Sequence, residues 1–88
     1  MFIAIEHQIH DPEAFRQRGE EVFPLPDDLH VHHFLPATDM SRANCLYEAP
    51  SVDRLQGYLD AKLGDASTQL YFPVHEAGAI GLPVRTGV

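Results

Sequence analysis

LHVHHFLPATDMSRANCLYE (residues 29–48) is the stretch of sequence that decides the fold. Leu29–Leu35 and Ala43–Glu48 each carry apolar and aromatic side chains, as strands do. Between them, Ala37–Ser41 contains the small and polar residues of a turn. The two segments are therefore predicted to pair as a β-hairpin.

A helix is predicted on each side of this hairpin. Before it, Asp11 is a good N-cap, Pro12 suits the first helical position, and Pro24 ends the helix. After it, Ser51 is an N-cap and Gly64 stands where a C-terminal glycine belongs. Each helix carries apolar or small residues near helical spacing: Phe15, Gly19, Val22 and Phe23 in the first, and Val52, Leu55, Leu59 and Leu63 in the second.

Two outer strands complete the pattern, Met1–Gln8 at the start and Thr68–His75 near the end. The order βαββαβ predicts an α+β, ferredoxin-like fold, in which a four-stranded antiparallel sheet carries both helices on one face. We expect residues 1–76 to form this domain and residues 77–88 to form a C-terminal tail.

The face of the sheet without helices is expected to need a cover. Six apolar or aromatic residues are expected to form an apolar surface on this face that is too large to stay exposed to water: Phe2, Val31, Leu35, Tyr47, Tyr71 and Phe72. A chain of 88 residues also has a thin core and often relies on a partner. A second copy on this face would give a dimeric α+β barrel, so we expect a homodimer.

Composition excludes several classes of partner. The formal net charge is −7, and the six Lys and Arg residues are scattered, so the chain lacks the basic face that nucleic acids require. No apolar run is long enough to span a membrane. Cys45 is the single cysteine, which rules out a disulfide within the chain. Together with an N-terminus unlike a signal peptide, these features predict a cytoplasmic location.

Histidine is the most unusual feature of the composition. Neutral imidazoles near a carboxylate suit a borderline divalent metal such as nickel, zinc or copper. Strand alternation places His30 and His32 on one face and His33 on the other. The alternative is that these are surface or hydrogen-bonded residues, and that polar residues on an edge strand guard against aggregation. The six are His7, His10, His30, His32, His33 and His75.

No complete catalytic motif is present in the sequence. Cys45 is expected to be a small buried residue, with a catalytic thiol as the alternative. Tyr47 and Tyr71 are able to hydrogen-bond a ligand inside a barrel, or to serve as core aromatics. These three residues are the candidates for ligand binding.

The run Asn44-Cys45-Leu46-Tyr47-Glu48-Ala49-Pro50-Ser51 resembles the Cys-Leu-x-Glu-Ala-Pro signature of a family of small bacterial ferredoxin-like proteins. Most members of that family have no assigned function, and one branch is described as nickel-binding. Phe2–His7 resembles the family's first strand, and His33 matches a histidine of its second strand. Where the family carries Asp and His, this chain has Ala4 and Glu6. The resemblance covers the first three strands and the second helix, and implies a dimeric barrel with Glu6 and His33 on the uncovered face.

Two functions that involve a ligand or substrate, and one alternative without a small-molecule site, follow from these features. The first is a homodimeric binding protein that holds a divalent metal, nickel or zinc, with Glu6, His7 and His33, or a small molecule beside Tyr47 and Tyr71. The second is a cofactor-free monooxygenase, cyclase or isomerase acting on a hydrophobic small molecule, with His33 as general base oriented by Glu6. The third is a protein with a stress-related or assembly role and a filled interior. The sequence leaves open whether the chain is an enzyme.

Overall fold

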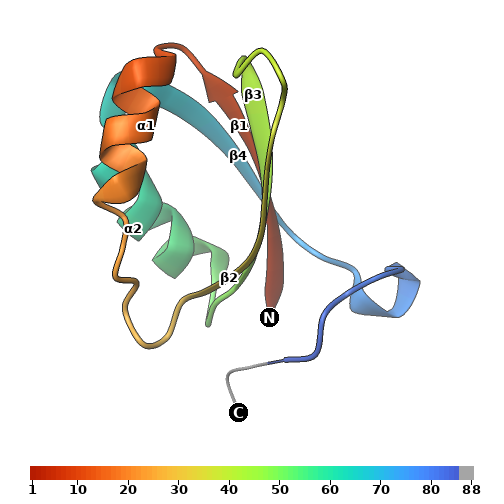
Figure 1. Cartoon of the computed structure of the whole chain (residues 1–88). Helices are drawn as coiled ribbons and strands as arrows, with labels where there is room; N and C mark the ends of the chain where they lie inside the picture. Colours follow the sequence, from red (N-terminus) through yellow and green to blue (C-terminus); the bar gives the residue numbers. More distant parts are fainter. Residues whose placement is uncertain (86–88) are drawn as a thin grey trace.

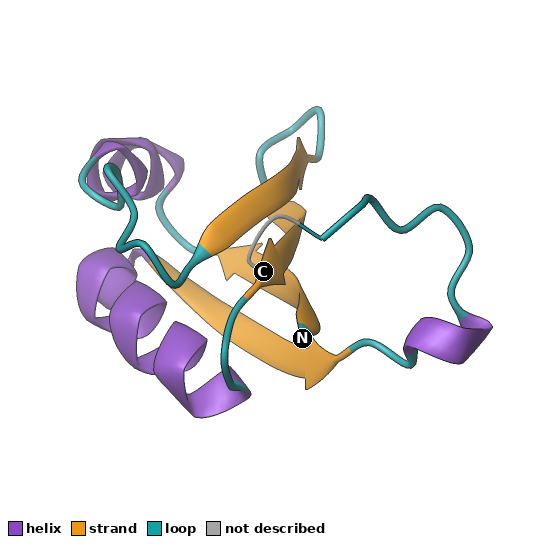
Figure 2. Cartoon of the chain, turned by 90° about the horizontal axis from the view of Figure 1, so that it is seen from below, coloured by secondary structure: helices purple, strands orange, loops and turns teal. Residues whose placement is uncertain are grey.

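The structure, a computed structural model that describes residues 1–85, has the predicted ferredoxin-like α+β architecture (Figure 1). Its sheet has the strand order β2-β3-β1-β4, with every neighbouring pair antiparallel. Both helices cover one face of this sheet, and the opposite face carries none (Figures 1 and 2). The elements are β1 (Phe2–Ile9), α1 (Pro12–Glu20), β2 (His30–Pro36), β3 (Arg42–Glu48), α2 (Val52–Leu63) and β4 (Ser67–Pro73).

Helix α1 begins as predicted but ends earlier. The Asp11 side chain accepts a hydrogen bond from the backbone N–H of Ala14 at 3.1 Å, which caps the helix. Helical spacing predicted that both Val22 and Phe23 belong to the packed face. Val22 is buried, but Phe23 is 53% exposed, so that prediction is wrong for Phe23. The helix ends at Glu20, three residues before Phe23, whose helical conformation the following Pro24 disfavours.

Helix α2 matches its prediction closely. Ser51 caps its start, and Leu55, Leu59 and Leu63 are all buried. Gly64 ends it with a φ of +56°, a conformation that costs a residue with a Cβ more than it costs glycine. A Cβ at Gly64 would also meet the guanidinium of Arg18, which donates to the Leu63 carbonyl at 3.0 Å. This contact ties α1 to the end of α2.

The strand register corrects the predicted assignment of the two sheet faces. Ile3, Ile5 and Ile9 of β1 point into the core beneath the helices. Tyr47 pairs with Ile3 and with Val31, and Tyr71 pairs with Ile5. Directly paired residues share a face. Val31, Tyr47 and Tyr71 therefore lie on the helix-covered face and not on the uncovered one, because the β1 isoleucines set the pleat of the whole sheet.

The uncovered face still carries large apolar side chains. Phe2 is buried there, whereas Leu35, Leu70 and Phe72 are 61%, 64% and 51% exposed. Leu70 and Phe72 lie on the edge strand β4, and Leu35 lies on the opposite edge strand β2. The predicted apolar character of this face is thus confirmed for Phe2, Leu35 and Phe72.

A β-bulge in β2 changes the predicted order of the histidines. Val31 pairs with Tyr47 and His33 pairs with Leu46, so His32 is an extra residue in the strand. His32 hydrogen-bonds to Glu48 on the uncovered side, and the bulge brings His33 to that same side. The prediction that His33 faces away from His30 and His32 is therefore wrong.

The chain after β4 leaves the sheet, forms one short 3₁₀ turn at Glu76–Gly78 and returns, so that the guanidinium of Arg85 lies 5.3 Å from the ring centre of Phe2 (Figure 2). The boundary predicted at residue 76 stays a prediction, and residues 86–88 of the predicted tail lie outside the described residues. Within residues 1–85, no helix has the length and apolar character needed to cross a membrane.

Candidate functional site

A pocket of about 460 Å³ lies on the helix-covered side of the sheet, between α1 and the β2–β3 hairpin. It exists because α1 packs mainly on α2 and on the 3₁₀ turn Gly64–Ala66, and contacts β2 only sparsely. The rings of Phe15 and Phe34 stack 6.3 Å apart and join α1 to β2. The apolar residues that line the pocket are Phe15, Val22, Phe23, Val31, Phe34, Met40, Leu59 and Leu63.

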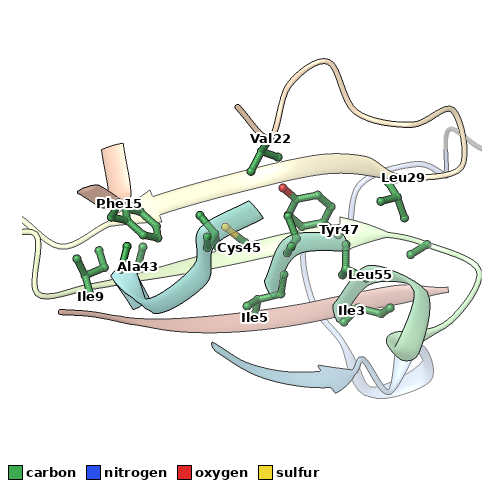
Figure 3. Close-up of a cluster of buried hydrophobic side chains, with 14 residues drawn as sticks. Ile3, Ile5, Ile9, Phe15, Val22, Leu29, Ala43, Cys45, Tyr47 and Leu55 are labelled. Carbon is green, nitrogen blue, oxygen red and sulfur yellow. The ribbon is translucent and has the colours of Figure 1, made fainter. Parts of the chain in front are cut away.

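Three side chains with polar atoms form the floor of this pocket. They are His7 from β1 and Cys45 and Tyr47 from β3, and they are only 3%, 8% and 4% exposed. All three occupy inward positions of the two central strands. Figure 3 shows two of them, Cys45 and Tyr47, on the same side of the sheet as Ile3 and Ile5. The chemistry that the pocket offers is therefore concentrated on the sheet.

Hydrogen bonds from the β4 side fix the orientation of the His7 ring. Its Nδ1 lies 3.2 Å from Oε1 of Gln69 on β4, and Nε2 of Gln69 donates to Asp60 on α2 at 2.9 Å. A carboxylate only accepts, so the amide NH2 of Gln69 must face Asp60 and its oxygen must face His7. Nδ1 of His7 is then the donor. Asp60 also accepts a hydrogen bond from the Tyr71 hydroxyl at 2.7 Å.

Burial keeps His7 neutral. Desolvation lowers the pKa of its imidazole below the ordinary 6.5, against the opposing effects of the Gln69 hydrogen bond and of Asp60. A neutral imidazole with a proton on Nδ1 has a lone pair on Nε2. That atom lies 3.2 Å from Sγ of Cys45. Since burial raises the pKa of the Cys45 thiol to about 12, the thiol stays protonated and donates a hydrogen bond to Nε2.

Tyr47 contributes a hydroxyl that no other side chain uses. Within residues 1–85, this hydroxyl makes no hydrogen bond, and because no buried side-chain oxygen there lacks a partner, the hydroxyl is open to the pocket that Tyr47 lines. The Tyr71 hydroxyl, by contrast, is occupied by Asp60. Of the three residues predicted to bind a ligand, the structure brings Cys45 and Tyr47 together in the pocket and leaves Tyr71 outside it.

The three predicted metal ligands do not come together within one chain. Glu6 and His33 lie on the uncovered face, separated by strand β3, whereas His7 lies on the other face. Among residues 1–85, no three His, Cys, Asp or Glu side chains are grouped so that they could hold an ion. Glu6 itself is exposed, and the buried carboxylate–imidazole pair of the uncovered face joins Glu48 to His32 at 2.8 Å.

Nothing in the local sequence singles out Gln69 and Asp60. Gln69 is an inward polar residue on an edge strand, and it becomes significant only because the register pairs it with His7. Asp60 borders the leucine stripe of α2 and looks like an ordinary solvent-facing residue in the sequence. Both residues gain their role from the pairing of β1 with β4, which brings His7 and Gln69 together across 62 positions of the chain.

Comparison with known proteins adds no assignment, because no protein-family model, no curated protein and no solved structure matches this chain. The chain has the small ferredoxin-like α+β fold that the resemblance at Asn44–Ser51 implies. Membership of that bacterial family and of its nickel-binding branch stays a prediction.

The lowered pKa of His7 predicts a specific dependence of stability on pH. The unfolded chain takes up the proton at about pH 6.5, while the folded chain resists it. The free energy of unfolding is therefore fully retained above pH 6.5 and falls as the pH drops below that value. Urea denaturation of the wild type and of His7→Gln, from about pH 8 to pH 5, should show the wild type losing stability relative to the variant. A difference that does not change with pH would contradict a neutral, buried His7.

Proposed function

We propose that this protein binds a neutral, apolar small molecule in the pocket between α1 and the β2–β3 hairpin. The observation that carries the proposal is the pocket itself, which is lined by apolar side chains and has a few polar atoms gathered at its floor. Ligand sites in proteins have this composition, and their volumes are roughly 300–1,000 Å³. A pocket of about 460 Å³ falls within that range.

The charges around the pocket support a neutral ligand. Arg16 and Glu20 at the rim form an ion pair with each other at 2.8 Å. The floor holds a neutral imidazole, a protonated thiol and a phenol, and a buried ionic group without a partner would be costly there. A molecule with an apolar body and one hydrogen-bonding group suits this arrangement, with the Tyr47 hydroxyl as the available partner.

Gly19 provides a way to close the pocket without disturbing its walls. It lines the pocket from α1, and a Cβ at this position would meet nothing within 4 Å. We predict that Gly19→Leu abolishes binding of the neutral fluorescent probe N-phenyl-1-naphthylamine, which the wild type should bind with one site per chain. Fluorescence titration measures the affinity of each protein for the probe and the number of binding sites per chain. Leucine also favours the helix more than glycine does, so the variant should fold.

Gly57→Leu is the matched control. Gly57 lies on the exposed face of α2, and a Cβ there also meets nothing within 4 Å. This variant should bind the probe as the wild type does. Equal binding by the wild type and Gly19→Leu would place the probe elsewhere on the protein and would sink the proposal.

We also propose that a second copy covers the uncovered sheet face. Packed sheets lie about 10 Å apart, and a two-fold axis parallel to the strands would place β2 over β4 of the second copy. Leu35 on β2 would then meet Leu70 and Phe72 of the other chain, at both edges of the interface. Glu6 on β1 would face β3 of the second copy, which carries Arg42 and Asn44. The face is thus self-complementary in both apolar contact and charge.

Phe72→Lys tests this arrangement, because it places an unpaired charge in the proposed interface. We predict that the wild type is a dimer by light scattering after gel filtration, and that Phe72→Lys weakens the dimer by at least about tenfold, or about 1.4 kcal/mol. Gln56→Lys adds the same charge on the exposed side of α2 and should leave the dimer intact. A wild type that is monomeric at micromolar concentration would contradict the proposal.

Nickel or zinc is not part of this proposal. Within one chain, Glu6 and His33 lie on different strands with β3 between them, and His7 is enclosed on the opposite face. A metal site built from Glu6 and His33 would need ligands from two copies.

A further inference from the structure

The floor of the pocket contains a nucleophile, a base and a hydrogen-bond donor in adjacent positions. The Cys45 thiol donates to Nε2 of His7 at 3.2 Å, and His7 is oriented in turn by Gln69. A nucleophile in contact with a base that a third group orients is the general arrangement of covalent catalysis. The Tyr47 hydroxyl lines the same pocket and makes no hydrogen bond among the described residues.

We infer that Cys45, His7 and Tyr47 form a site for conjugate addition to a neutral, apolar α,β-unsaturated carbonyl compound. The inference rests on the proposed function, because the compound must occupy the same pocket. Cys45 and Tyr47 are two positions apart on β3 and project to the same side of the sheet (Figure 3). Such residues are about 7 Å apart at Cβ. In such a substrate the carbonyl oxygen is three bonds from the attacked β carbon, so one molecule can reach both Sγ of Cys45 and the hydroxyl of Tyr47.

The step is balanced without any further reactant. Sγ of Cys45 forms a bond to the β carbon while its proton passes to Nε2 of His7. The π electrons of the C=C bond move toward the carbonyl oxygen, which accepts a hydrogen bond from Tyr47. The His7 imidazolium then returns the proton to the α carbon. The net change is addition of S–H across the double bond, and it requires no oxidant or reductant.

Acyl transfer fits the same residues less well. That reaction needs N–H donors beside the attacked carbonyl, often from the backbone. Cys45 lies on a central strand and is paired on both sides, with Ile5 and with Phe34, so its backbone groups belong to the sheet ladders. Conjugate addition moves the developing charge away from the sulfur and toward Tyr47.

The resting thiol should be selective for compounds that enter the pocket. Burial holds the pKa of Cys45 at about 12, so almost no thiolate is exposed to reagents in water. Base-assisted attack depends instead on neutral His7, whose pKa is lowered by burial. The rate of addition should therefore already be level at pH 6.5 and above, whereas an ordinary free thiol reacts faster up to about pH 8.5.

Cinnamaldehyde is a suitable probe, with intact-mass spectrometry to follow the adduct. We expect one adduct per wild-type chain, located at Cys45, and a rate that stays flat above pH 6.5. His7→Gln should react about 100-fold more slowly and lose the plateau. Tyr47→Phe should keep the plateau and react about tenfold more slowly. Cys45→Ser combined with Gln56→Cys places the thiol on the exposed face of α2, and its rate should rise with pH like that of glutathione.

The outcomes separate this inference from the proposed function. A wild type that binds N-phenyl-1-naphthylamine in the pocket but forms no adduct at Cys45 overturns the inference alone. Reaction that follows the pH profile of glutathione, or that Gly19→Leu leaves unchanged, overturns it as well. Loss of both probe binding and adduct in Gly19→Leu, with a pH plateau in the wild type, supports it. If His7→Gln does not fold, Tyr47→Phe and the wild-type pH profile decide the question.

Discussion

A histidine buried between isoleucines on a central strand of a small sheet is the constraint on which the rest of the site depends. His7 follows Ile5 and precedes Ile9 on the inward face of β1, where an unsatisfied imidazole nitrogen would be costly. Side chains from both neighbouring strands provide hydrogen-bond partners for the two ring nitrogens. Gln69 of β4 accepts from Nδ1, and Cys45 of β3 donates to Nε2. Asp60 of α2 then fixes Gln69, so one proton arrangement satisfies the whole chain of groups.

The packing of α1 gives this network a chemical use. If α1 lay against β2, His7 and Cys45 would be inert members of the core. Because α1 instead packs toward α2 and Arg18 holds it to the end of that helix, an apolar space remains above the two residues. The same fold thus separates two surfaces with different roles: a pocket beneath the helices that suits a ligand, and an apolar sheet face that suits a second copy.

Local sequence signals predicted the architecture well and the site poorly. Caps such as Asp11, Ser51 and Gly64 act within a few residues, so the helix starts and the end of α2 were predictable. The side of the sheet to which each strand residue points was not predictable. Apolar and polar residues alternate only weakly around Val31, Tyr47 and Tyr71, and these residues take their orientation from the register that β1 sets. The bulge at His32 puts His30 and His32 on the same face as His33, which strand alternation alone did not predict. Cys45 and Tyr47 were correctly chosen as candidates, but their link to His7 depends on register between strands far apart in the chain.

The protonation of the His7 ring tests this account most directly. Long-range ¹H–¹⁵N NMR correlation at neutral pH distinguishes the two neutral tautomers and the imidazolium by their nitrogen shifts. The account predicts a neutral ring with the proton on Nδ1 and a lone pair on Nε2, directed at Cys45. A ring that is charged at neutral pH, or that carries its proton on Nε2, would contradict it.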